Sequence, residues 1–433
     1  MSVKPFYVKK GNVYAVPITH YTMEMAHSVR QAFLDIDPDA IAVELPETMA
    51  LQFLHAGSRL PDISVIISYS ADQTPIYYLA EPCDPSFEAI RSAQEKGKPA
   101  FCIDLDVDFY PDIHDPIPDP YSIKRIGLKS YYELYLKAAK PLNAIDESRE
   151  MHMAKRLKEL SLQYDKVLFV CGMAHLESIL NKLDLNSYPI EMPAERGFVE
   201  IATLTEDAAR EVLAEPPFIT KAYEESRNGM MPDRQKLLFR LFKEAAIPYE
   251  NESGMPFAGY NIQNIMKFAR NYALVTNRLL PDLYQILTAA KGCVDANYAY
   301  EVWKLATDYP YIKNIDNLQE LDLSIDELWG KSKLLKFQLK QKNLKAFHFD
   351  RRKKDKSRAS FKPPGPFSIC SYPPEDICIE KFGEFLKKKG TQLLVEDSAR
   401  TIPFSTSIED GIDTRETIRH FAEKKLYVKT KGK

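Results

Sequence analysis

The stretch NVYAVPITHYTMEMAHSVRQAFLDIDPDAIAVEL, residues 12–45, changes its character twice along its length. Residues 12–18 form an apolar run after Asn12, residues 23–36 carry apolar side chains at helical spacing, and residues 40–45 are apolar again except for Glu44. A strand, a helix and a second strand in this order form a βαβ unit, in which the two strands run parallel. This stretch therefore predicts an α/β fold.

The same alternation continues to about residue 204. Further strands are predicted at 75–80, 99–107, 166–172 and 191–204, and helices at 84–97, 147–164 and 173–183. Strands that are apolar throughout and separated by helices are typical of a parallel sheet that is covered on both faces. We predict an α/β domain over residues 1–204 with a mostly parallel sheet.

The rest of the chain has a different pattern. Helical spacing of apolar residues predicts a helical domain over residues 205–330. A basic, proline-rich linker follows at 331–365, and a small α+β module is predicted at 366–433. We expect the aromatic residues of the helical domain to build its core; they are Phe239, Phe242, Phe268, Tyr272, Tyr284 and Trp303.

Composition narrows the class of protein. The 433 residues are 45% hydrophobic and 27% charged, with a net charge of -3, which indicates a globular protein and argues against a surface built wholly for nucleic acid. No apolar run is long enough to cross a membrane and the N-terminus lacks a secretory signal, so we expect a cytoplasmic protein with no membrane partner. The six cysteines form no CxxC pair, so neither a zinc knuckle nor a disulfide framework is predicted.

Several common catalytic motifs are absent from the sequence. It contains no GxGxxG after a strand, no GxxxxGK[ST], no HExxH and no GxSxG. Nucleotide-binding, zincin and α/β-hydrolase functions therefore lack support, and no nucleotide cofactor is expected.

Four polar side chains come at or just after the ends of predicted strands: His20, Glu44, Asp104 and His175. The carboxyl ends of parallel strands lie along one edge of a sheet, where α/β proteins bind their ligands. We therefore expect these side chains to converge on one site.

Two chemistries fit this set. His20, Glu44 and His175 could hold a divalent metal such as zinc, manganese, cobalt or iron. Without a metal, His20 would deprotonate water, Glu44 would orient its ring, and His175 would act as the acid. Asp104 is then expected to contact substrate or to support a residue that does.

The predicted helix 147–164 adds three candidates. Arg149 and His152 share one helical face. Arg149 could hold a carboxylate or stabilise an oxyanion, and Glu150 and His152 could contact substrate or the residues around it. The alternative is a solvated basic face.

These segments, in this order, resemble the erythromycin esterase/ChaN/TraB superfamily, which includes the Tiki-type metalloproteases. The resemblance covers about residues 10–220 and is carried by PITH with His20, AVEL with Glu44, REMHMA with Arg149 and Glu150, and GMAH with His175. It is strongest for a bacterial branch described as ChaN/erythromycin-esterase-like and linked to conflict or defence gene clusters. One departure is Pro17, which stands where the family has glycine.

The resemblance implies different activities for different members. Tiki-like proteins are metal-dependent peptidases, erythromycin esterases are metal-free hydrolases with a histidine base, and ChaN binds iron or haem. We expect a hydrolase of ester or amide bonds. The alternatives are an inactive scaffold that binds a protein partner through its helical or C-terminal domain, and a nucleic-acid-binding factor that uses the basic residues 331–358.

Overall fold

The structure is a computed structural model that describes residues 5–70, 75–108, 117–139, 143–323, 400–403 and 427–430. The chain divides into two compact units, Met1–Lys342 and Asn343–Lys433. The predicted linker 331–365 lies outside the described residues, as does most of the predicted module 366–433. In that module only an antiparallel pair is described, β10 (Arg400–Pro403) with β11 (Tyr427–Thr430).

A five-stranded sheet forms the centre of the α/β part, and its order is β1-β2-β7-β3-β6. The strands are β1 (Val8–Lys10), β2 (Val13–Ile18), β7 (Val167–Gly172), β3 (Ala40–Pro46) and β6 (Ala100–Asp104). The last four are parallel, and β1 pairs antiparallel with β2 at one edge. The predicted α/β class is confirmed.

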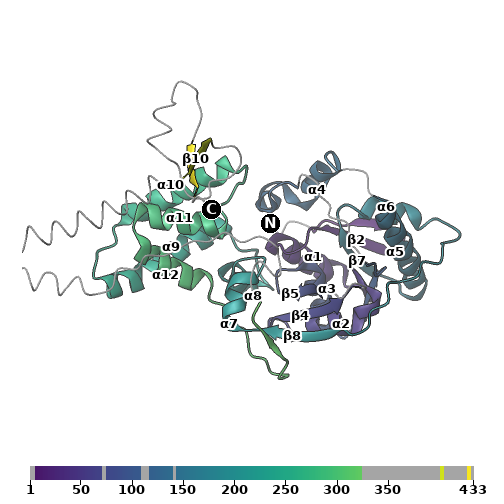
Figure 1. Cartoon of the computed structure of the whole chain (residues 1–433). Helices are drawn as coiled ribbons and strands as arrows, with labels where there is room; N and C mark the ends of the chain where they lie inside the picture. The colour runs from purple at the N-terminus through teal and green to yellow at the C-terminus, as the bar shows by residue number, and fades with distance from the viewer. Residues whose placement is uncertain are drawn as a thin grey trace, which may run out of the picture. The chain divides into compact units, whose positions relative to one another are not determined.

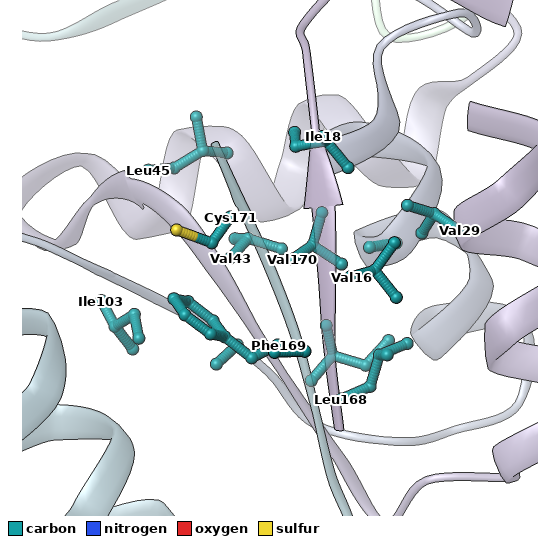
Figure 2. Close-up of a cluster of buried hydrophobic side chains, with 14 of the residues drawn as sticks. Val16, Ile18, Val29, Val43, Leu45, Ile103, Leu168, Phe169, Val170 and Cys171 are labelled. Carbon is teal, nitrogen blue, oxygen red and sulfur yellow. The ribbon is translucent and has the colours of Figure 1, made fainter. Parts of the chain in front are cut away.

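Helices pack against this sheet from two sides (Figure 1). They are α1 (Met23–Ile36) and α3 (Pro85–Glu95) on one side, and α5 (Ala144–Gln163) and α6 (Leu176–Lys182) on the other. The side chains of β2, β3 and β7 interlock with those of α1 in a fully buried core that includes Val16, Val29, Val43, Phe169 and Val170 (Figure 2). Burial of this apolar surface is the main force that fixes the sheet.

Two predicted strands belong elsewhere, and this corrects the sequence interpretation. Residues 75–80 and the end of 191–204 lie in a second, four-stranded sheet of order β5-β4-β8-β9. Its strands are β4 (Ser64–Tyr69), β5 (Pro75–Ala80), β8 (Glu200–Leu204) and β9 (Glu320–Leu321). β4 pairs antiparallel with β5 and with β8. Residues 70–74, which join β4 to β5, are too few for the helical crossover that a parallel pair requires.

Shorter elements connect these parts. They are the 3-10 helices at Glu47–Met49 and Pro120–Ser122, and the helices α2 (Ala50–Arg59), α4 (Ile123–Leu136), α7 (Glu206–Val212) and α8 (Pro217–Ser226).

The predicted helical region contains four longer helices. They are α9 (Arg234–Ser253), α10 (Gly259–Val275), α11 (Leu283–Cys293) and α12 (Ala296–Ala306). Phe242 is fully buried in their common core, but Phe239 is 50% and Phe268 45% exposed, so the expectation that all six aromatic residues build the core was wrong for these two. In the part of the chain that the structure describes, no helix has the length and apolar character to cross a membrane.

Candidate functional site

The turns after β2 and β7 lie side by side at the carboxyl edge of the sheet. Ile18 pairs with Gly172 in the parallel ladder, and the amide of Met173 donates to the carbonyl of Ile18 at 2.9 Å. His20 and His175 follow these two strand ends. Pro17 lies inside β2, opposite Cys171, so the proline belongs to the strand and not to the turn that carries His20.

Arg149 of α5 lies at the centre of a buried cluster of carboxylates. Its Nη2 donates to Glu44 Oε1 at 2.9 Å and to Asp104 Oδ2 at 2.7 Å, and its Nη1 donates to Asp146 Oδ1 at 3.0 Å. All four side chains are less than one-tenth exposed. Of the predicted residues, the structure thus brings Glu44, Asp104 and Arg149 together.

The carboxylate of Glu44 is fixed from several directions. Its Oε2 accepts the amide of Gly172 at 2.6 Å, and a Cβ at that glycine would lie only 3.1 Å from the same oxygen. Burial alone would raise the pKa of Glu44, but the charges of His175 and Arg149 outweigh burial and hold it well below its usual value. Glu44 is therefore ionised.

Asp104 differs from Glu44, although both bind Arg149. Burial raises the pKa of Asp104, the nearby charge of Glu44 adds to the rise, and Arg149 compensates only in part. The pair therefore holds a proton more readily on Asp104 than on Glu44.

His175 lies beside this cluster and is only 4% exposed. Its Nδ1 is 3.1 Å from Glu150 Oε1, and its Nε2 is 3.5 Å from Glu44 Oε1. Burial lowers the pKa of His175. The charge of Glu44 and the hydrogen bond to Glu150 raise this pKa by more than burial lowers it, so the net shift is upward. Glu150 also accepts a hydrogen bond from Lys182 Nζ at 2.6 Å, which fixes its carboxylate.

His20 is the exposed imidazole of the site. Its side chain is 42% exposed, and its Nδ1 is 3.1 Å from Asp84 Oδ2. Burial of part of the ring lowers the pKa of His20, but the hydrogen bond to Asp84 and its charge raise the pKa above its usual value. We expected Glu44 to orient this ring; in the structure Asp84 is the residue in that position.

Local structure explains why Asp84 and His20 meet. Asp84 is the N-cap of α3, and its Oδ1 accepts the amides of Ser86 at 2.8 Å and Phe87 at 3.2 Å. The remaining oxygen is turned toward His20. On the other side, Tyr21 has a φ of 55°, a left-handed conformation that is costly for a residue with a Cβ and that turns the chain from β2 into α1.

His152 lies apart from the cluster. Its Nε2 is 3.2 Å from Glu47 Oε2, and Glu47 is also paired with Arg156 at 2.8 Å. The hydrogen bond to His152 lowers the pKa of Glu47. Arg149 and His152 therefore share a helix but serve two different clusters.

The structure adds no support to the predicted metal site. Among the described residues, no three His, Cys, Asp or Glu side chains are grouped so that they could hold a metal ion. A cation bound to Glu44 would also lie against the guanidinium of Arg149, which is 2.9 Å from Oε1. The divalent metal therefore stays a prediction, and no step below uses one.

Two residues of the site escaped the sequence analysis. Asp84 follows the end of β5, the same signal that selected the other candidates, but its place before a proline and a helix suggested only a cap. Asp146 lies three residues before Arg149 on α5, a spacing that brings two helical side chains together.

Comparison of the chain with protein-family models, with curated proteins and with solved structures finds no match.

Proposed function

We propose that this protein is a hydrolase of ester or amide bonds in which His20 is the general base. The observation that carries the proposal is the pair His20–Asp84, an exposed imidazole held through Nδ1 by a buried carboxylate. In this proposal Nδ1–H donates to Asp84, which leaves Nε2 of the neutral ring as the proton acceptor. The resemblance to erythromycin esterases, which use a histidine base, agrees with this assignment.

The chemistry follows from this arrangement. His20 Nε2 takes a proton from water, and the resulting hydroxide attacks the carbonyl carbon of the substrate. The imidazolium is stabilised by the negative charge of Asp84 and returns its proton to the leaving oxygen or nitrogen. Asp84 keeps its negative charge throughout and acts as a positioning residue.

The buried cluster has a supporting role in this proposal. The guanidinium of Arg149 donates to three carboxylates, so we assign it the positioning of Glu44 and not the binding of substrate. The charges of Glu44 and Arg149 both act on the pKa of His20, the first raising it and the second lowering it. The buried cluster thus contributes to the pKa of His20 without contacting the substrate.

The test is hydrolysis of a panel of aryl esters and peptide amides by the full chain and by three variants. We expect His20→Ala to lower kcat/KM by about 10²–10⁴-fold, as for loss of a general base. His55→Ala is the matched control, because His55 is equally exposed and also lies near an aspartate, Asp316, but is on α2. It should hydrolyse the panel like the parent.

Asp84→Asn gives a second readout. Asparagine can still cap α3, so the melting temperature should change little. Without the carboxylate, the pKa of His20 falls, and the acid limb of the pH profile of kcat/KM should move to lower pH. Hydrolysis that survives His20→Ala would contradict the proposal, and activity that EDTA removes and zinc or manganese restores would favour the metal alternative.

A further inference from the structure

The outer face of α10 has an unusual composition. Residues 259–281, which include α10 and the turn after it, contain no Asp or Glu, three cations (Lys267, Arg270 and Arg278), and five Asn or Gln side chains. A helix on the surface of a chain with net charge -3 normally carries both signs. This segment is therefore a local positive surface.

The helix separates its residues by face. Ile265, Ala269 and Ala273 are buried, and α11 is the element that α10 contacts most. Tyr260, which is 65% exposed, lies on the opposite face, whereas Phe268, which is 45% exposed, lies on the flank of the helix with its ring edge-on to that of Tyr272 at 6.3 Å between centroids. A partner that covered the exposed parts of the two rings would remove their apolar surface from water.

Of the three cations, Lys267 lies along the axis between the two rings, Arg270 lies on the adjacent side of the helix, and Arg278 follows the end of α10. Tyr260, Asn264, Lys267, Phe268 and Asn271 fall within an arc of about 100°, with Lys267 at one end of the arc and Phe268 at the other. The two rings are separated by about 12 Å along the axis at 1.5 Å per residue. No ion pair joins Lys267 to another residue in the part of the chain that the structure describes, and the same holds for Arg270 and Arg278.

We propose that the outer face of α10 binds single-stranded nucleic acid. Cations without a carboxylate neighbour pair with phosphates, exposed rings stack on unpaired bases, and amide side chains bond to base edges. A duplex keeps its bases stacked on one another and offers nothing to the rings. The surface contains none of the residues assigned to the proposed hydrolase site.

The test is fluorescence anisotropy of a labelled 20-nucleotide RNA or DNA single strand, of mixed sequence, with the full chain at several salt concentrations. Replacing Lys267, Arg270 and Arg278 together by glutamine should weaken binding at least tenfold and reduce the slope of log Kd against log salt by about 2. The matched control replaces Arg125, Lys129 and Lys137, three exposed cations of α4 and its end, and should leave binding within twofold.

The rings have a distinct signature. Tyr260→Ala with Phe268→Ala should weaken binding about tenfold and leave the salt slope unchanged, because stacking releases no counterions. Both rings are exposed, so the fold should persist.

The inference is overturned if the parent does not bind the strand at 50 mM salt, or if the α10 and α4 variants lose equal affinity. It is also overturned if removing the two rings has no effect on affinity. The same holds if binding is lost only when Arg351, Arg352, Lys353 and Lys354 are neutralised. Equal competition by heparin, together with intact binding of the ring variant, would identify a general polyanion surface and also overturn it.

Discussion

Replacing Arg149 by methionine is expected to lower the free energy of unfolding by about 3–5 kcal/mol at pH 7.5, the range found when one partner of a buried ion pair is removed. The guanidinium is the cation that Glu44, Asp104 and Asp146 share, and each of these carboxylates is almost completely buried. Without it, three negative charges face one another in a region of low dielectric. Urea unfolding followed by circular dichroism measures the loss.

Arg156→Met is the matched control, because it makes the same substitution two turns further along α5. Arg156 is 30% exposed and binds Glu47 and Glu159, so its removal should cost less than about 1 kcal/mol. The cost of Arg149→Met should shrink as the pH falls from 8 to 5, because the stranded carboxylates take up protons. An equal loss of unfolding free energy in the two variants would show that Arg149 stabilises the fold no more than an exposed arginine does.

Replacing Glu81 by glutamine is expected to stabilise the protein at neutral pH. Glu81 is fully buried; its Oε2 accepts the amide of Ala214 at 3.1 Å, and its Oε1 has no hydrogen-bond partner among the described residues. Burial raises the pKa of Glu81 well above its usual value, and the neighbouring charge of Glu215 raises it further. The folded protein therefore keeps a proton there that the unfolded chain releases.

The sign of the pH dependence follows from this difference. Below the unfolded pKa of about 4.5 both states hold the proton, and the variant and the parent should be nearly equal in stability. Above it, the parent loses about 1.4 kcal/mol for each pH unit until the raised pKa is reached, whereas glutamine does not titrate. The advantage of Glu81→Gln should therefore be absent near pH 4.5 and grow as the pH rises toward the raised pKa of Glu81.

Thermal and urea unfolding at pH 4.5, 6 and 7 would measure this trend. Glu177→Gln is the control, since it makes the same substitution at an exposed position, on α6. An advantage of Glu81→Gln that stays constant over this range would mean that the carboxyl group ionises in the folded protein.

The sequence predicts the central part of the fold well, and the reason is physical. A parallel strand buried on both faces must be apolar along its buried length, and residues 13–18, 40–43 and 167–171 satisfy this rule. Glu44 and Asp104 at the ends of such strands then have to meet at one edge of the sheet, as the structure shows.

Other features depended on packing between distant segments. The pattern in β5 does not say which sheet it joins, because a half-buried strand of six residues fits either one. Phe239 and Phe268 have the helical spacing of core residues, but only the positions of α9 and α10 in the bundle decide which face is covered. The pairing of His20 with Asp84 spans 64 residues and depends on how α3 meets the turn after β2.

The two carboxylate oxygens of Asp84 affect when His20, the proposed base, becomes able to accept a proton. One caps the first turn of α3 and the other holds the imidazole of His20. The rotational freedom of Asp84 is therefore lost as α3 forms, before any ligand arrives, so in the proposed mechanism a ligand would meet a preorganised base and would not have to order it. Local fraying of that one helical turn would release the imidazole while the rest of the sheet stays folded, which makes the start of α3 a place where small backbone changes act on chemistry.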